Sequence, residues 1–261
     1  MQKIIAIVGG DARQQAAGEY LRGQGHQVVG ADQVYRADVI LLPLLLDEEQ
    51  AELARLLRAA KPGATALGGR VSEAAYRLAE AVGVTLLDYF ERPELAELNA
   101  IPTAEECIGI LLEGRRRTLW GSPVLVTGYG RVGRALARRL VLLGAQVTAA
   151  ARSPEQRALA LGDGCRAIPL TGLAAAAAGL DAVVNTIPAP VLGPGVLLRL
   201  APGALVVDLA SRPGGTDFDA ARAAGVRAIH ALSLPARCAP VTAGEFVARA
   251  VLDILRERGE L

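Results

Sequence analysis

Several residue types on which enzymes commonly rely are scarce in this sequence of 261 residues. Lys3 and Lys61 are the only lysines among the 28 basic residues, so 26 (28 − 2) are arginines, and the only histidines are His26 and His230. Histidine and lysine are frequent general bases in enzymes. The composition therefore argues against a mechanism built on either base, and arginine must supply most of the anion binding.

The sequence also lacks a strong net charge and long apolar runs. It carries 28 basic and 27 acidic residues, which gives a formal net charge of +1. This charge provides no overall electrostatic field that would attract nucleic acid or an anionic membrane. The longest apolar run, residues 39–46, is far shorter than the roughly 20 residues of a membrane-spanning helix. Because no secretory signal follows Met1, we expect a cytoplasmic protein that binds neither nucleic acid nor membrane.

Cysteines are few and widely spaced. Cys107, Cys165 and Cys238 lie 58 and 73 residues apart (165 − 107 and 238 − 165). An odd number at these spacings suits neither a zinc site nor a disulfide framework. We predict three buried thiols and no metal site.

Short β-branched runs alternate with longer helical stretches through most of the chain, as in βα units that build parallel sheets. A first series of predicted strands covers residues 4–8, 27–30, 39–42, 65–67 and 84–87. A second series covers residues 124–127, 146–150, 182–186, 205–209 and 226–230. The pattern predicts an α/β protein with two Rossmann-like domains.

Two segments place a threonine three residues before a glutamate, the pattern of a capping box that starts a helix. They are Thr103 with Glu106 and Thr242 with Glu245, just before and just after the second series. We predict that both start interdomain helices. The first domain would then comprise residues 1–102 plus 239–261 and the second residues 103–238, with the active-site cleft between them. Two successive domains with a trailing helix are the alternative.

A glycine motif follows the first strand of the second series and opens a helix. It reads Gly128-Tyr129-Gly130-Arg131-Val132-Gly133. In this context the first glycine permits a tight turn, the second lets a pyrophosphate approach the backbone, and the third allows close packing of helix on strand. Amides at the helix start then face the phosphates. The motif predicts a dinucleotide site.

The end of the next strand bears on which dinucleotide is bound. An NAD site would place Asp or Glu there, whereas this chain has Ala151, Arg152 and Ser153. A guanidinium and a hydroxyl suit a 2′-phosphate, so we predict NADP rather than NAD. The alternative is that Ser153 only caps the following helix, and the two roles can coexist.

Polar residues follow several other predicted strands, at the sheet edge where open α/β sheets bind ligands. Thr186, Ile187 and Pro188 should lie near the nicotinamide, and Arg212 lies in a glycine-rich loop after the next strand. In the first domain the candidates are Asp11, Arg13, Arg92 and Asn99. Asp11 can equally serve as a helix cap.

These segments together resemble the A subunits of bacterial dipicolinate synthases. The similar stretches include Gly-Gly-Asp-Ala-Arg-Gln at 9–14, Phe-Glu-Arg at 90–92, the glycine motif, Asn-Thr-Ile-Pro at 185–188 and Asp-Leu-Ala-Ser-Arg-Pro-Gly-Gly-Thr-Asp at 208–217. Cys107, Ser233 and Arg237 depart from the family pattern near the domain hinge.

The resemblance implies oxidation of dihydrodipicolinate, or its hydrated tetrahydro precursor, to pyridine-2,6-dicarboxylate in the mother cell of a sporulating bacterium. It also implies a flavoprotein-like B subunit, while self-association of the chain stays open. Because the ring becomes aromatic as hydride and proton leave, a weak base suffices. We predict that Arg13, Arg92 and Arg212 hold the carboxylates, with Asp11 and Asn99 orienting the substrate or handling protons.

Two other functions remain open. One is a noncatalytic NADP-binding subunit that scaffolds or regulates a partner. The other is a keto or hydroxy acid dehydrogenase, although such enzymes commonly use a Lys or His that this sequence scarcely offers.

Overall fold

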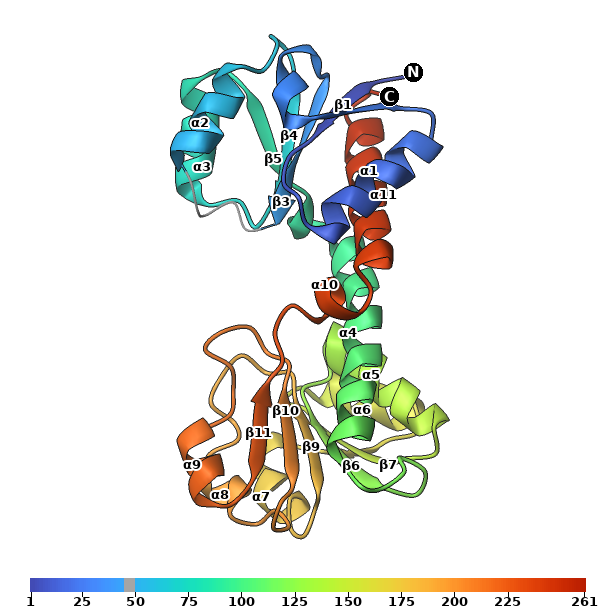
Figure 1. The fold of residues 1–261 in the computed structure, drawn as a ribbon. Helices are drawn as coiled ribbons and strands as arrows, with labels where there is room; N and C mark the ends of the chain where they lie inside the picture. The colour runs from blue at the N-terminus through green and yellow to red at the C-terminus, as the bar shows by residue number, and fades with distance from the viewer. Residues whose placement is uncertain (45–49) are drawn as a thin grey trace. The chain divides into compact units, whose positions relative to one another are not determined.

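The computed structural model describes residues 1–44 and 50–261. The end of the apolar run 39–46 lies outside the described part, as do the first residues of the helix that the Ala- and Leu-rich stretch 48–60 predicts. The chain forms two compact units, one of Met1–Asn99 with Ala239–Leu261 and one of Ala100–Cys238 (Figure 1). Each unit is built on a parallel sheet. Both sheets confirm the predicted α/β fold class.

The sheet of the first unit has five strands in the order β2-β1-β3-β4-β5. The strands are β1 (Ile4–Ile7), β2 (Gln27–Gly30), β3 (Val39–Leu44), β4 (Thr65–Gly69) and β5 (Thr85–Asp88). All neighbouring pairs are parallel. This is the flavodoxin-like strand order, whose switch point lies between β1 and β3.

Helices cover both faces of this sheet (Figure 1). They are α1 (Ala12–Gly23), α2 (Gln50–Arg58), α3 (Glu73–Ala81) and α11 (Pro240–Glu257), with 3₁₀ turns η1 (Ala31–Arg36) and η2 (Tyr89–Glu91). Leu21 of α1 and Val251 of α11 pack on one face, and Leu57 of α2 and Ala79 of α3 pack on the other. A sheet buried on both faces explains why its strands read as continuous apolar runs.

The sheet of the second unit has six strands in the order β11-β10-β9-β6-β7-β8, the doubly wound order of dinucleotide-binding domains. The strands are β6 (Pro123–Thr127), β7 (Gln146–Ala150), β8 (Arg166–Ile168), β9 (Ala182–Asn185), β10 (Leu205–Asp208) and β11 (Arg227–His230). The sequence pattern did not predict β8. This strand has three residues, none fully buried, so it lacks the apolar run that marks the others.

Helices also cover both faces of the second sheet. The elements are α4 (Pro93–Gly114), α5 (Arg131–Leu142), α6 (Pro154–Gly162), η3 (Leu170–Gly172), α7 (Leu173–Ala176), α8 (Pro194–Leu197), α9 (Phe218–Ala223) and α10 (Leu234–Cys238). Leu111 of α4 and Leu136 of α5 belong to the core on one face, whereas Leu173, Leu197 and Ala221 belong to the core on the other.

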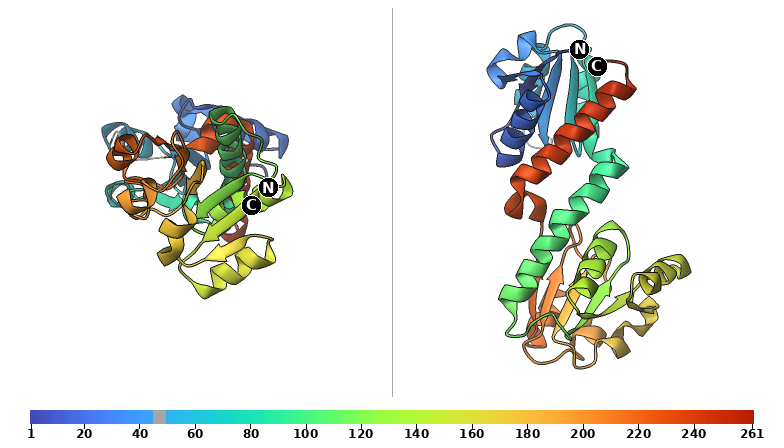
Figure 2. Two further views of the ribbon diagram at one scale, coloured as in Figure 1. Left: turned by 90° about the horizontal axis from the view of Figure 1, so that it is seen from below. Right: turned by 90° about the vertical axis from the view of Figure 1, so that its right-hand side faces the viewer.

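The capping-box prediction is wrong for Thr103, whereas at the second segment a helix does start but Thr242 is not its cap. Thr103 lies inside α4, which begins ten residues earlier at Pro93 and passes through Pro102 as one continuous helix (Figure 2). Thr242 lies in the first turn of α11, whose N-cap is Ala239. Pro102 cannot donate a backbone hydrogen bond and normally marks a helix start. Here the packing of α4 outweighs that local preference.

The three cysteines differ in exposure, which corrects the prediction that all are buried. Cys107 and Cys165 are buried, whereas Cys238 is exposed at the end of α10. Burial raises the pKa of the Cys107 thiol well above its usual value.

Within the part of the chain that the structure describes, none of the helices has both the length and the apolar character needed to cross a bilayer.

Gly244 permits the close packing of α11 on α1. A Cβ atom at this position would lie 2.3 Å from the carbonyl oxygen of Arg13 and 2.8 Å from the Cβ of Ala16. These neighbours are backbone and a buried alanine, so they cannot move aside as the end of a flexible side chain would. The two helices are therefore held at a distance that only glycine allows.

We expect Gly244→Ala to lower the free energy of unfolding by about 1–3 kcal/mol because it overpacks this contact. Gly23→Ala is the matched control, since a Cβ at the last residue of α1 meets nothing within 4 Å. That variant should lose no stability. Urea unfolding of both variants measures the difference, and equal stabilities would show that the α1–α11 contact adjusts freely.

Candidate functional site

The glycine motif forms a sharp turn between β6 and α5. Gly128 has φ +89°, a conformation that L-residues rarely adopt, and its N–H donates to the carbonyl oxygen of Ala150 at 2.8 Å. A Cβ atom here would lie 2.3 Å from Oγ1 of Thr186. The hydroxyl of Thr186 itself donates to the carbonyl oxygen of Thr127 at 2.8 Å. Gly128 is therefore required both by its backbone conformation and by the neighbouring strand end.

The other two glycines have contrasting surroundings. A Cβ at Gly133 would lie 2.2 Å from the carbonyl oxygen of Gly128, so this glycine lets α5 approach the turn. A Cβ at Gly130 would meet nothing within 4 Å, and Gly130 is exposed at the N-cap of α5. The turn thus leaves open space beside the helix N-terminus, where backbone N–H groups favour an anion. The geometry fits a dinucleotide pyrophosphate.

The remaining residues of the motif differ in where their side chains lie. Tyr129 is buried, and its hydroxyl donates to Oδ2 of Asp163 at 2.9 Å. Burial and this hydrogen bond raise the pKa of Tyr129 above its usual value. Arg131 is exposed at the start of α5 and Val132 is half-buried. The side chain of Tyr129 therefore serves the core of the unit, which leaves its backbone for the predicted cofactor contact.

The segment after β7 combines a helix cap with an exposed cation. Ser153 is the N-cap of α6, and its Oγ accepts from the N–H of Gln156 at 3.0 Å. This confirms the capping role. Arg152 is exposed, and its carbonyl oxygen accepts from Nη1 of Arg157 at 2.8 Å. The guanidinium of Arg152 has no hydrogen-bond or ion-pair partner among the described residues.

A buried hydrogen-bonded row crosses the carboxyl edge of the same sheet. Thr127, Asn185 and Asp208 are the final residues of adjacent strands β6, β9 and β10, and all three are fully buried. The hydroxyl of Thr127 donates to Oδ1 of Asn185 at 2.6 Å, and Nδ2 of Asn185 donates to Oδ1 of Asp208 at 2.8 Å. We call these three residues the strand-end row.

The strand-end row also fixes two loops. Asp208 accepts from the N–H of Ala210 at 3.0 Å and of Gly215 at 2.8 Å. Asn185 binds the backbone of Ile187 through both side-chain atoms, at 3.0 and 3.1 Å. The loop after β9, with Thr186, Ile187 and Pro188, is thereby joined to the loop after β10. Neither Asn185 nor Asp208 was predicted as a site residue, although a polar residue ending an apolar strand was a usable signal.

The loop after β10 carries the predicted residue Arg212. This residue is exposed, and its guanidinium has no hydrogen-bond or ion-pair partner in the described ranges 1–44 and 50–261. Further along, His230 at the end of β11 lies 2.8 Å through Nε2 from the carbonyl oxygen of Ala210. Because that oxygen only accepts, the contact requires a proton on Nε2. His230 thus helps to hold the loop that presents Arg212.

In the first unit, Asp11 and Arg13 form a pair at the start of α1. Asp11 caps the helix by accepting from the N–H groups of Arg13 and Gln14 at 2.9 and 3.0 Å. The guanidinium of Arg13 also binds its carboxylate at 3.0 Å. Burial opposes ionisation of Asp11, but the hydrogen bonds from Gln14 and Arg13 outweigh it and lower the pKa of the carboxyl below its usual value. Asp11 is therefore a charged cap.

Arg92 is also engaged with carboxylates of its own unit. Its Nη1 and Nη2 bind both oxygens of Glu257 on α11, at 2.7 and 2.6 Å, and its Nε binds Glu94. The hydrogen bonds to Glu257 and Glu94 raise the pKa of Arg92 above its usual value. Arg92 therefore ties α11 to the chain just before α4.

Asn99, the last predicted residue of this unit, is half-buried within α4 and makes an interaction of its own.

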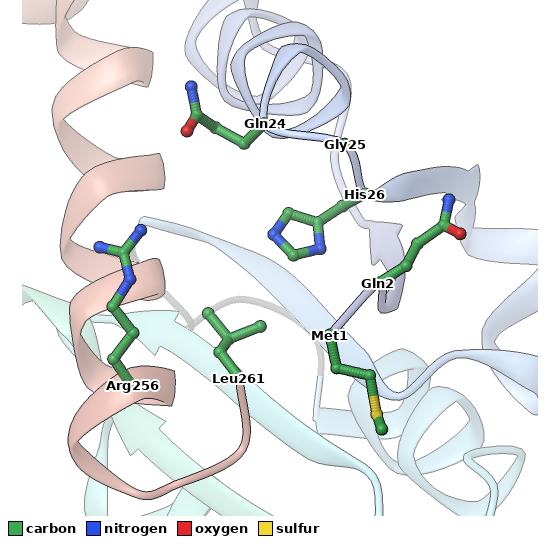
Figure 3. A pocket seen from close by; sticks show the side chains of 7 residues that line it. All are labelled: Met1, Gln2, Gln24, Gly25, His26, Arg256 and Leu261. Carbon is green, nitrogen blue, oxygen red and sulfur yellow. The ribbon is translucent and has the colours of Figure 1, made fainter.

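A pocket in the first unit lies away from the predicted residues (Figure 3). It encloses about 400 Å³ and is lined by Met1, Gln2, Gln24, Gly25, His26, Arg256 and Leu261. His26 precedes β2 and Gln2 precedes β1, so the pocket lies at the amino edge of the sheet. Open parallel sheets bind ligands at the opposite edge.

No group of three or more His, Cys, Asp or Glu side chains suited to a metal occurs in the described part.

Comparison with known proteins agrees with this architecture. No protein-family model matches the chain. The A subunit of dipicolinate synthase from Bacillus subtilis (strain 168) is 33% identical over 284 residues, which covers 97% of this chain and 96% of the relative. The chain belongs to the family of dipicolinate synthase A subunits.

Two solved structures of this dipicolinate synthase family share the fold over nearly the whole chain. The Bacillus subtilis A chain superposes with a TM-score of 0.87 at 30% identity, covering 100% of this chain and 98% of that one. The corresponding dipicolinate synthase protein from Bacillus halodurans gives a TM-score of 0.86 at 29% identity, covering 97% of each chain. The fold described above is therefore the fold of the family.

We expect Asp208→Ala to lower the free energy of unfolding by about 3 kcal/mol or more. The change leaves the buried donors of Asn185, Ala210 and Gly215 without their acceptor, and each unsatisfied group costs about 1–3 kcal/mol. The control is Asp219→Ala, whose side chain is 92% exposed. It should change stability by no more than about 0.5 kcal/mol. Equal effects in urea unfolding would contradict a stabilising role for the strand-end row.

Proposed function

We propose that this protein binds NADP and oxidises dihydrodipicolinate, or its hydrated tetrahydro precursor, to pyridine-2,6-dicarboxylate. The observation that carries the proposal is the glycine turn, in which Gly128 and Gly133 permit contacts that no side chain would allow while Gly130 faces open space. Such a turn at a helix N-terminus suits a pyrophosphate. Membership of the family of dipicolinate synthase A subunits supports the substrate class.

The choice of NADP rests on the segment after β7. Arg152 is exposed and Ser153 is half-buried, and no acidic residue stands at 150–154 to repel a 2′-phosphate. Backbone N–H groups of residues 129–132 would hold the pyrophosphate, and the loop with Thr186, Ile187 and Pro188 would border the nicotinamide. When bound, the nicotinamide accepts a hydride. The strand-end row keeps this loop in place through Asn185.

For the substrate, the protein would contribute binding and orientation more than base catalysis. Loss of a hydride and a proton makes the dihydro ring aromatic, after the hydrated precursor has lost one water. A weak base or water therefore suffices to take the proton. Arg212 is exposed, binds no carboxylate of the described residues and suits a substrate carboxylate. To bind the substrate, Arg13 and Arg92 would have to release the protein carboxylates that they bind in this structure. Asp11 and Asn99 would orient the substrate or handle its proton.

A second candidate function is a noncatalytic NADP-binding subunit. Its support is that the related Bacillus subtilis protein is named as one subunit of a synthase, which implies a partner.

We propose that this chain works with a flavoprotein-like B subunit in the cytoplasm of a sporulating mother cell. The scarcity of lysine and histidine favours a site that needs such a partner for full turnover.

Single-turnover absorbance at the reduced nicotinamide band separates the two functions. With NADP and dihydrodipicolinate, we expect the chain to form about one reduced cofactor per active site, slowly alone and faster with a partner subunit. A chain that binds NADPH but never reduces NADP, with or without a partner, would be a binding subunit only. Full-rate turnover by the chain alone would contradict the partner requirement.

Arg152→Ala should weaken NADPH binding by about 2 kcal/mol and leave NADH binding almost unchanged. A charge-assisted hydrogen bond to the 2′-phosphate has a free energy of about this size. Fluorescence titration of wild type and variant with both nucleotides measures it. Arg222→Ala, an exposed arginine of α9 in the same unit, serves as control and should change neither affinity. Equal wild-type affinities for NADPH and NADH, or a parallel loss of both, would refute NADP.

A further inference from the structure

We propose that Arg70 binds a carboxylate of the substrate. The proposal rests on the dicarboxylate oxidation proposed above and adds a residue to it. Arg70 directly follows β4 of the first unit, at the carboxyl edge of the sheet. It was not among the residues that the sequence indicated, because a single arginine after two glycines forms no motif.

The backbone of Arg70 has a conformation that only glycine adopts easily. Its φ is +53°, one of two positive values among the described residues other than glycine. Such a conformation is strained for a residue with a Cβ and persists only when the surroundings determine it. Glycine would remove the strain at no steric cost. An arginine at this position therefore suggests that its side chain is needed there.

The surroundings of Arg70 fix this conformation through the neighbouring strand. Asp88, at the end of β5, accepts from the N–H groups of Arg70 at 3.1 Å, Val71 at 2.8 Å and Phe90 at 2.7 Å. With three backbone donors on its carboxylate, Asp88 clamps the turn after β4 to the turn after β5. The direction in which the chain leaves β4, and with it the position of Arg70, is thereby set.

The residue before Arg70 adds a second restraint. A Cβ at Gly69 would lie 2.5 Å from Cδ1 of Leu44 and 2.7 Å from the ring of Tyr89. Tyr89 is buried, so its ring cannot move aside. Gly69 is therefore pressed against the core, and the next residue must turn outward.

The guanidinium of Arg70 lies over an aromatic ring and has no carboxylate partner among the described residues. It lies 5.4 Å from the ring centroid of Phe90, in a cation–π contact, and the residue is exposed. Within the described ranges it forms no ion pair or side-chain hydrogen bond, whereas Arg13 and Arg92 bind carboxylates of their own unit. Among residues 1–44 and 50–261, no side chain therefore competes with a ligand for the donors of Arg70.

The chemistry of this position suits a planar aromatic acid. A guanidinium presents a rigid fork that binds a carboxylate through two parallel hydrogen bonds. Phe90 offers an apolar ring beside it, against which a flat ring can pack. The carboxyl edge of an open parallel sheet is also where such proteins bind ligands. Together these features point to a pyridine dicarboxylate or its reduced precursor.

The test is calorimetric titration of pyridine-2,6-dicarboxylate into the full chain saturated with NADPH. We expect Arg70→Gly to weaken binding about tenfold or more while the melting temperature stays equal or rises, because glycine relieves the strained backbone. Arg70→Lys should recover part of the affinity. Arg77→Ala, an exposed arginine of α3 paired with Glu73, is the control and should bind as wild type does.

Pyridine-2-carboxylate, which lacks the second carboxylate, distinguishes a contact from a structural effect. Wild type should prefer the dicarboxylate, and Arg70→Gly should lose about tenfold of that preference because the second carboxylate has lost its partner. An unchanged preference in Arg70→Gly would overturn the proposal for Arg70 alone. Failure of the wild-type chain with NADPH to bind the dicarboxylate would overturn the proposed function, and the role of Arg70 with it.

Discussion

The hydrogen bonds of the strand-end row hold the loops after β9 and β10 of the second unit in place. Thr127, Asn185 and Asp208 are opposite one another in the register of three adjacent strands, so each can bind its neighbour without moving the backbone. The same side chains then hold the loops that follow β9 and β10. Because buried polar groups must find partners, these loops cannot shift independently of the sheet.

Glycine close contacts complete this arrangement. Gly215 lies so near the loop after β9 that a Cβ would meet the carbonyl oxygen of Ile187 at 2.4 Å. Gly128 approaches the same loop from the other side, where a Cβ would meet the hydroxyl oxygen of Thr186 at 2.3 Å. Three turns that are distant in sequence are therefore closely packed. Room for a ligand remains at Gly130, where the helix N-terminus faces open space.

The arginines divide into those that support the fold and those that are available to ligands. Arg13 neutralises a helix cap, Arg92 ties Glu257 of α11 to the chain before α4, and Arg134 binds Asp163 beside Tyr129. Arg152, Arg212 and Arg70 are exposed, and their guanidinium groups bind no carboxylate of the described residues. Composition alone suggested that arginine binds anions, but many of the arginines bind the protein's own carboxylates.

The sequence by itself determined the two parallel sheets and the glycine turn. Buried β-branched runs and a glycine motif between strand and helix are local signals, because fully buried strands must be apolar and only glycine adopts φ near +89° without strain. Local signals failed where packing competes with them, as at Thr103 and Pro102, which lie inside α4. Only the tertiary structure decided which arginines are paired, that Asn185 and Asp208 meet, and that Asp88 holds Arg70. These contacts join residues from separate strands and turns, so their geometry depends on strand register and not on neighbours in the chain.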